Sequence, residues 1–108
     1  MVNQGDIIKV NFNPQKGHEQ AGYRPAVVIS NDIFNQKTNL AIVCPITNTN
    51  NKFPLHVPLN ARLQTTGVVL CEHIRTLDLL ARNYIFVEKM PKGLLQKVID
   101  ITFAEIEM

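Results

Sequence analysis

Several features are missing from this chain of 108 residues, and each absence narrows its function. No apolar run approaches the ~20 residues that a membrane-spanning helix needs, and Asp6 comes before any apolar stretch typical of a signal peptide. The two cysteines, Cys44 and Cys71, lie in separate apolar segments, which is typical of reduced thiols in a cytosolic protein. We therefore expect a cytoplasmic protein that does not bind a membrane.

The common catalytic motifs are missing too. The three histidines, His18, His56 and His73, form no pair at metal-ligand spacing. The glycines stand singly rather than in a phosphate-binding loop, and no serine occupies a nucleophile elbow. Strict alternation along a strand would place Cys71 and His73 on one face and Glu72 on the other, which is too small a set of ligands for zinc. We expect no metal and no cofactor.

Length and composition indicate one globular domain over residues 1–108. Hydrophobic residues make up 45% and charged residues 19%, as in ordinary globular proteins. A domain of this size buries roughly 65% of its unfolded surface, so its core needs neither a disulfide nor a metal. The net charge of +2 permits nucleic-acid binding without requiring it.

Short apolar segments bounded by turn residues predict five or six strands, at residues 6–12, 26–30, 40–46, 55–59, 67–72 with an extension over 74–77, and 84–87. In the first of these, Ile7 breaks the alternation, and we expect a strand with one well-buried side. Pro58 indicates that its strand lies at an edge.

Two helices are predicted as well. Asn31 and Asp32 are suited to cap a single helical turn that ends at Asn35. After Pro91 the period changes, and apolar positions recur at helical spacing from Leu94 to Ile106, which we interpret as core. The fold class is therefore mainly β (α+β), a small and strongly curved antiparallel sheet with a C-terminal helix.

A polar loop at residues 17–25 holds the densest chemistry in the chain. His18, Glu19 and Arg24 lie in it, directly before the apolar run 26–29. Pro25 restricts Arg24 to an extended backbone, and a guanidinium held there has the planar donors that suit a phosphate. The alternative is that Arg24 and Glu19 only pair across a surface turn.

These side chains, with the hydroxyl of Thr47, suit the cleavage of RNA. The 2′-hydroxyl is an intramolecular nucleophile, so the protein must stabilise charge on the phosphorane and move two protons. Arg24 suits the first task, and Thr47 suits the positioning of a phosphate oxygen. Glu19 or Glu72 would accept the 2′-hydroxyl proton, and His18 would protonate the departing 5′-oxygen.

Three segments carry a resemblance to a known family: residues 5–30, which include Glu-Gln-Ala-Gly-Tyr-Arg-Pro, residues 44–48 (Cys-Pro-Ile-Thr-Asn), and residues 65–83. The chain resembles the MazF/PemK/Kid toxins of bacterial toxin–antitoxin pairs over nearly its whole length. The resemblance implies a small SH3-like, CcdB/MazF-like barrel and a homodimer. It also implies a metal-independent endoribonuclease, an mRNA interferase that cuts single-stranded RNA, leaves 2′,3′-cyclic phosphate and 5′-hydroxyl ends, and arrests translation and growth.

The resemblance also assigns roles to residues. Arg24 and Thr47 match the central catalytic pair of the family, and Glu19 matches a supporting carboxylate. His18 matches a histidine of the Kid-like branch, and Glu72 falls where that branch has a catalytic aspartate. The proton donor stays open between Arg24, His18 and water.

One departure from the family pattern bears on Glu72. Leu70 stands where Kid carries an arginine that takes part in its chemistry. This departure favours the scheme of the MazF branch, with Arg24 and Thr47, and weakens a catalytic role for Glu72.

The RNA-binding residues are expected in the loops around the site, at Gln20, Asn48, Lys52, Phe53, Gln64, Thr65, Thr66, Glu72 and Arg75. Aromatic residues make up only 6% of the chain, so we expect recognition of base edges by hydrogen bonds, and hence a preferred sequence. Phe53 is alternatively a core residue, and Arg75 is alternatively an ion-pair partner of Asp78.

The family resemblance further implies an acidic antitoxin whose disordered tail folds along the RNA groove. Two other functions were weighed. A gyrase poison like CcdB would need a Trp-Gly-Ile tail, whereas this chain ends Ile-Glu-Met and contains no tryptophan. A non-catalytic RNA-binding or adaptor module would bind RNA without producing cyclic-phosphate ends.

Overall fold

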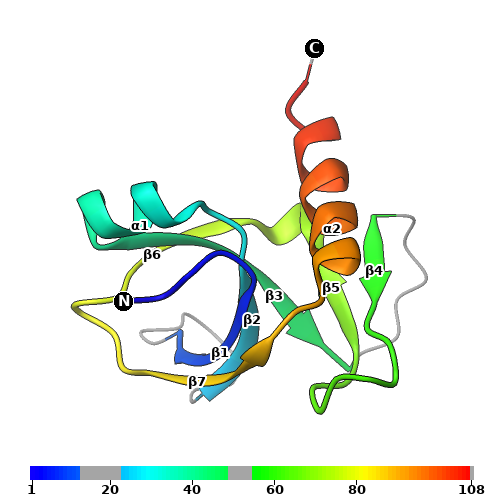
Figure 1. The fold of residues 1–108 in the computed structure, drawn as a ribbon, viewed down its shortest axis with the longest axis horizontal. Helices are drawn as coiled ribbons and strands as arrows, with labels where there is room; N and C mark the ends of the chain where they lie inside the picture. Colours follow the sequence, from blue (N-terminus) through cyan, green and yellow to red (C-terminus); the bar gives the residue numbers. More distant parts are fainter. Residues whose placement is uncertain (13–22, 49–54, 108) are drawn as a thin grey trace, which may run out of the picture.

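The computed structural model describes residues 1–12, 23–48 and 55–107. Within them the chain forms the strands β1 (Asp6–Asn11), β2 (Tyr23–Val28), β3 (Leu40–Thr47), β4 (His56–Pro58), β5 (Val68–Leu70), β6 (Arg75–Asp78) and β7 (Tyr84–Lys89), and the helices α1 (Asp32–Thr38), η1 (Cys71–His73, a 3-10 turn) and α2 (Lys92–Ala104). This arrangement confirms the predicted antiparallel sheet with a C-terminal helix (Figure 1). No helix in these residues is long and apolar enough to cross a membrane.

The strands form one antiparallel sheet in the order β4-β5-β3-β2-β1-β7. The longest strand, β3, has three partners: β2, β5 beside its C-terminal end, and β6 beside its N-terminal half. The path ends at β4 and β7, so over the described residues the sheet does not close into a barrel.

Both faces of the sheet are covered by core. One cluster gathers Ile8 and Val10 with side chains of β2, β3 and β6, and the other gathers Ile7 with side chains of β4, β5 and α2. The side with Ile8 and Val10 is well buried, as predicted, and Ile7 on the other face is also fully buried, which the sequence pattern did not predict. The reason is that α2 packs onto the second face with Val98 at 0% exposure. Ile106 lies beyond α2 and is 65% exposed, so its assignment to the core was wrong.

The predicted strand over residues 67–72, with its extension, is broken in the structure. β5 pairs with Ile46 and Thr47 of β3, whereas β6 pairs with the opposite half of β3, from Leu40 to Val43. The 3-10 turn η1 carries the chain between these two positions. Alternation therefore stops at Cys71, which is buried, while His73 becomes exposed.

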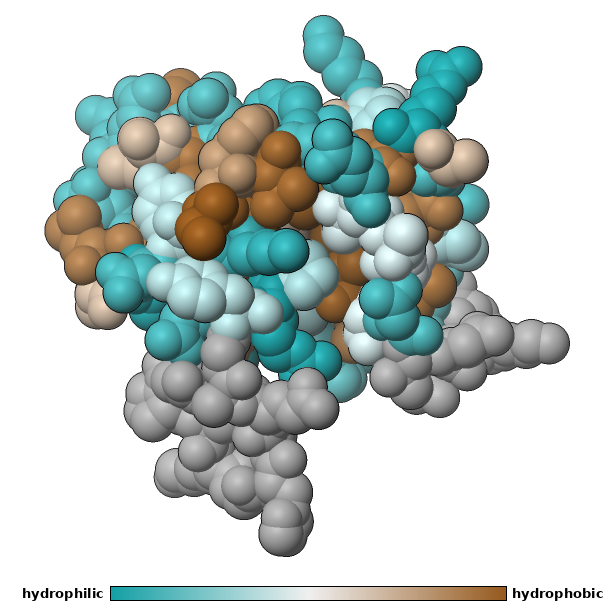
Figure 2. Space-filling model, turned by 90° about the horizontal axis from the view of Figure 1, so that it is seen from below, coloured by the Kyte–Doolittle hydropathy of each residue, from teal (hydrophilic) through white to brown (hydrophobic). Residues whose placement is uncertain are grey.

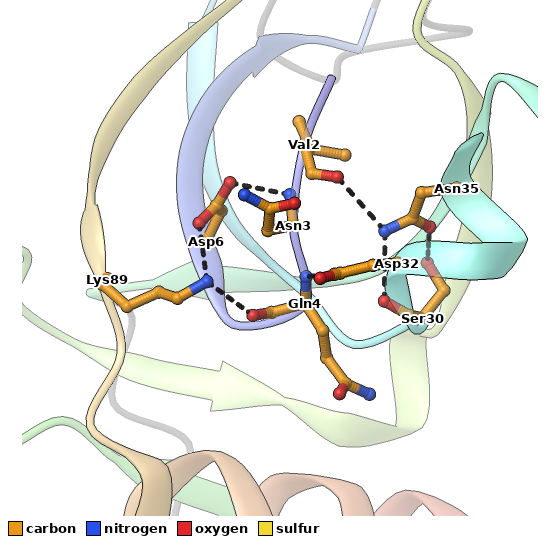
Figure 3. Close-up of polar contacts among 8 residues, drawn as sticks. All are labelled: Val2, Asn3, Gln4, Asp6, Ser30, Asp32, Asn35 and Lys89. Carbon is orange, nitrogen blue, oxygen red and sulfur yellow. Dashed lines mark hydrogen bonds and ion pairs between the residues drawn. The ribbon is translucent and has the colours of Figure 1, made fainter.

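Helix α1 is longer than the single turn that was predicted. Asn31 caps it, since its side-chain oxygen accepts a hydrogen bond from the backbone N–H of Phe34 at 2.8 Å. The helix ends at Asn39, which adopts a left-handed backbone with φ of 59°. Asn35 is fully buried, and its amide donates to the carbonyl of Ser30 (Figure 3).

Polar contacts join the N-terminal segment to β7 and α1 (Figure 3). The ammonium of Lys89 lies 3.0 Å from the carboxylate of Asp6 and donates to the carbonyl of Gln4 at 2.7 Å. The backbone N–H of Gln4 donates to Asp32 at 2.7 Å. These contacts fix the start of β1, the strand that lies between β2 and β7.

Candidate active site

Arg24 and Thr47 are neighbours across two paired strands. Ala26 of β2 lies opposite Pro45 of β3, and the same antiparallel register, continued by two residues, places Arg24 opposite Thr47. Directly opposed residues point to the same face of a sheet. Both side chains line one cleft of about 300 Å³, together with Phe12, Pro45, Ile46, Leu70, His73 and Arg75. We name this space the Arg24 cleft.

The Arg24 cleft is electropositive. Two guanidinium groups line it, from Arg24 and from Arg75, and no carboxylate of the described residues does. The guanidinium of Arg75 lies 5.0 Å from the centre of the Phe12 ring, a cation–π contact that orients it. The alternative partner of Arg75, Asp78, instead accepts hydrogen bonds from the backbone of the turn that follows it. A cleft with this charge suits an anion such as a phosphodiester.

A second cleft, of about 420 Å³, opens on the other face of the same strands. It is lined by Lys9, Tyr23, Pro25, Asn48, Gln64, Thr65, Thr66 and Val87, and we name it the Gln64 cleft. Successive residues of a strand face opposite sides, so Tyr23 and Pro25 face this cleft while Arg24 faces the other. Four of the predicted RNA-binding residues meet here. Lys9 and Tyr23 were missed, although their alternation with core residues was a usable signal.

The loop that carries Gln64 is held by Glu88 of β7. The carboxylate of Glu88 accepts hydrogen bonds from the backbone N–H of Gln64 at 3.1 Å and from the backbone and hydroxyl of Thr65 at 2.8 Å each. Burial opposes ionisation of this carboxyl, but these hydrogen bonds outweigh it and lower its pKa. The hydroxyl of Thr66 donates to Asn48 at 3.0 Å. The backbone of Gln64 and Thr65 and the side chains of Asn48, Thr65 and Thr66 are thus held in place before any ligand binds.

Exposed hydrophobic side chains lie near the Gln64 cleft. Tyr23 of β2, which lines the cleft, is 46% exposed, and Ile85 of β7, which lies opposite Lys9, is 56% exposed. Figure 2 views the lower side of Figure 1, along which β7 runs, and shows hydrophobic groups lying among hydrophilic ones. A surface of this kind offers both flat apolar contacts and hydrogen bonds.

Glu72, which the sequence reasoning placed among the RNA-binding residues, lines neither of the two clefts. One oxygen of its carboxylate is 2.7 Å from Nε2 of His56, whose side chain is only 6% exposed. The other oxygen is buried and has no hydrogen-bond partner among the described residues. Burial alone would raise the pKa of Glu72, but hydrogen bonds and the charge of His56 lower it. The turn η1 directs this carboxylate to β4 rather than to the Arg24 cleft.

His73 is a cleft residue that the sequence reasoning missed. It lines the Arg24 cleft, and its side chain is 62% exposed. Its position depends on η1, for which the sequence pattern gave no signal.

The remaining predicted residues, His18, Glu19, Gln20, Lys52 and Phe53, lie outside the described residues. Among residues 1–12, 23–48 and 55–107, no group of three or more His, Cys, Asp or Glu side chains is placed to hold a metal ion.

Comparison with known proteins decides the family. Residues 3–101 match the PemK-like, MazF-like toxins of type II toxin–antitoxin systems. The chain belongs to this family. It is 34% identical over 102 residues to the endoribonuclease PemK of Escherichia coli, covering 91% of this chain and 77% of the relative. It is 39% identical over 79 residues to the endoribonuclease toxin MazF of Escherichia coli K12, covering 73% of this chain and 70% of the relative.

Solved structures of the family have the same fold. A crystal structure of MazF from Deinococcus radiodurans superposes with a TM-score of 0.88 at 36% identity, over 99% of this chain and 97% of that one. A MazE–MazF structure from the same organism gives a TM-score of 0.89 at 34% identity, over 99% of this chain and 97% of that one.

Proposed function

We propose that this toxin-family endoribonuclease cuts single-stranded RNA, mRNA included, at a preferred sequence and without a metal ion. The observation that carries the proposal is the meeting of Arg24 and Thr47 in one electropositive cleft. A sphere of about 300 Å³ is about 8 Å across, so a single phosphodiester in the cleft is within reach of both side chains.

The chemistry starts with attack of the 2′-oxygen on the neighbouring phosphorus. The O2′–P bond forms, the P–O5′ bond breaks, and the products are a 2′,3′-cyclic phosphate and a 5′-hydroxyl. Arg24 stabilises the extra negative charge of the phosphorane, and the hydroxyl of Thr47 positions a phosphate oxygen. Because Glu72 is engaged with His56, we assign acceptance of the 2′-proton to Glu19.

Sequence preference comes from the Gln64 cleft. Its amides and hydroxyls, at Asn48, Gln64, Thr65 and Thr66, match the donors and acceptors of base edges. Gln20, Lys52 and Phe53 are assigned to the same RNA path. The Glu88 anchor supports selectivity, because donors already held in place lose little entropy when a base binds.

We also propose that the chain acts as a homodimer. An apolar cleft of about 360 Å³ lies between the sheet and α2, with Phe34, Ile42, Ile74 and Phe103 among its lining residues. Phe103 is 62% exposed in the single chain, and a second copy would remove it from water. Ile74 lies between His73 and Arg75 in the chain, so this interface would border the Arg24 cleft. Phe103→Glu should shift the sedimentation coefficient to that of a monomer.

The partner that restrains such a nuclease is an acidic antitoxin. Structures of related MazF proteins with MazE support an antitoxin partner. We propose that a disordered tail rich in Asp and Glu occupies the RNA path of this cytoplasmic toxin and relieves its arrest of translation and growth. A synthetic tail that binds the toxin without inhibiting cleavage would contradict a shared path.

The test is digestion of a long RNA in excess EDTA, followed by primer extension and analysis of the ends. We expect cuts at a short recurring sequence with 5′-hydroxyl and cyclic-phosphate ends. Arg24→Ala should abolish the cuts without lowering the urea midpoint, whereas Lys97→Ala, which removes an exposed positive charge of α2, should cut normally. Full cleavage by a folded Arg24→Ala protein would refute the mechanism. Saturable RNA binding without cuts would instead support a non-catalytic module.

A further inference from the structure

Among the described residues that line the Arg24 cleft, His73 is the one whose side chain is of a type that exchanges protons near neutral pH. Among its lining residues, arginine holds its proton too tightly to donate it, and the threonine hydroxyl is a weak acid. His73 is different, because an imidazole titrates between about pH 5 and 8. Its side chain is 62% exposed, so a substrate in the cleft can reach it.

The backbone of His73 is held firmly in place. The residue ends η1, whose first residue, Cys71, is fully buried. The preceding residue, Glu72, is tied to His56 of β4 at 2.7 Å. The side chain of His73 makes no hydrogen bond to the described residues, and it forms a long ion pair with Glu72, whose Oε2 lies 3.8 Å from Nε2. An imidazole with an anchored backbone and uncommitted ring nitrogens is suited to donate a proton to a ligand.

The charges around His73 depend on whether a phosphodiester is bound. Arg24 of β2 and Arg75 of β6 line the same cleft, and the carboxylate of Glu72 on η1 lies 3.8 Å from Nε2 of His73. A phosphodiester between the two guanidinium groups would offset their positive charge and place a negative charge beside the imidazole.

We propose that His73 is the general acid of the cleavage reaction, an inference that rests on the proposed function. As the P–O5′ bond breaks, its electron pair goes to the 5′-oxygen. The imidazolium of His73 donates one proton to that oxygen and becomes neutral. The 2′-proton passes to Glu19, the base assigned above, so the reaction itself neither gains nor loses a proton. Before the next turnover His73 regains a proton from water, and Glu19 releases its proton to water.

The test compares His73→Gln with His18→Gln, the alternative that the sequence raised. Two oligonucleotides contain the cleavage site, one with the ordinary 5′-oxygen and one with a bridging 5′-sulfur. Sulfur leaves as a thiolate and needs no proton. We expect His73→Gln to slow cleavage of the oxygen substrate by about 10²–10³-fold and to cleave the sulfur substrate at nearly the wild-type rate. Because the side chain of His73 is exposed, we expect His73→Gln to unfold at the same urea concentration as the wild-type protein.

The pH profile is a second readout. An acid must be protonated to act, so the wild-type rate on the oxygen substrate should fall as pH rises through the imidazole range. That alkaline limb should be absent in His73→Gln and on the sulfur substrate.

Other outcomes overturn the inference in recognisable ways. If His73→Gln cleaved both substrates equally slowly, His73 would only bind RNA. If the sulfur substrate restored the rate of His18→Gln but not that of His73→Gln, His18 would be the general acid. Arg24→Ala serves as the separate control, because charge stabilisation is needed for either leaving group. If Arg24→Ala cleaved both substrates normally, the proposed function itself would fail, whatever His73 does.

Discussion

Gly67 offers a sharp test of how closely the C-terminal end of β3, at Thr47, is packed against the segment before β5. It precedes β5 and has a φ of +116°, a region that residues with a side chain rarely adopt. A Cβ there would lie 2.2 Å from the carbonyl oxygen of Thr47 and 2.7 Å from its carbonyl carbon. An ordinary C···O contact is about 3.3 Å, so the backbone of Thr47 would have to move about 1 Å away from the new Cβ at position 67.

The cost of Gly67→Ala has two parts. Backbone strain adds about 1–3 kcal/mol, and forced overpacking adds about 1–3 kcal/mol, so the free energy of unfolding should fall by roughly 2–6 kcal/mol. The displacement also reaches the active site. A shift of about 1 Å in a catalytic group is expected to slow cleavage by roughly 10²-fold, even in the fraction of molecules that stay folded.

The matched control is Gly93→Ala in the first turn of α2. A Cβ at Gly93 meets nothing within 4 Å, so alanine should stabilise the helix by about 0.5–1 kcal/mol and leave cleavage unchanged. Both variants are measured by urea unfolding and by initial rates well below the unfolding transition. A Gly67→Ala protein with wild-type stability and rate would refute the contact between Gly67 and Thr47.

Three further predictions concern stability and reactivity. Asn31→Ala removes the side chain that caps α1 and should lower the free energy of unfolding, measured in urea, by about 1 kcal/mol. Asn31→Asp can still accept the capping hydrogen bond and should keep most of the wild-type stability. Equal losses in the two variants would argue against the cap. The pKa of Glu72 is lowered in the folded protein, so its carboxylate stabilises the fold above the ordinary pKa of 4.5 and loses this effect as pH falls through the folded pKa. Glu72→Gln should therefore weaken the fall in the free energy of unfolding at acid pH. An unaltered pH dependence would count against the pair of Glu72 with His56. Burial raises the pKa of Cys44 to about 12 and of Cys71 to about 11. A thiol reagent at about pH 8 should therefore label neither cysteine until urea unfolds the chain. Rapid labelling of the native protein would contradict this burial.

Much of the fold followed from local hydrophobic pattern. Short apolar segments bounded by turn residues located the strands, and helical spacing of apolar residues after Pro91 located α2. Ile7 marks the limit of this reasoning. The local pattern shows a break in alternation, but whether α2 covers the second face is decided by parts of the chain far away in sequence.

The site divides in the same way. Pro25 and the apolar run after it were enough to indicate that Arg24 is held at the start of a core strand. The position of Glu72 was not predictable, because a strand pattern places it by alternation whereas η1 turns it toward His56. The same turn brought His73 into the Arg24 cleft.

The sequence by itself determined the residue types available for RNA chemistry, the strand and helix periods, and the family to which the chain belongs. Only the tertiary structure decided which of those residues share a cleft. Arg24 meets Thr47 because of the register of β2 against β3, and His73 joins them because β5 and β6 pair with different halves of β3. Register and crossover depend on contacts between residues distant in the chain, which no local pattern encodes.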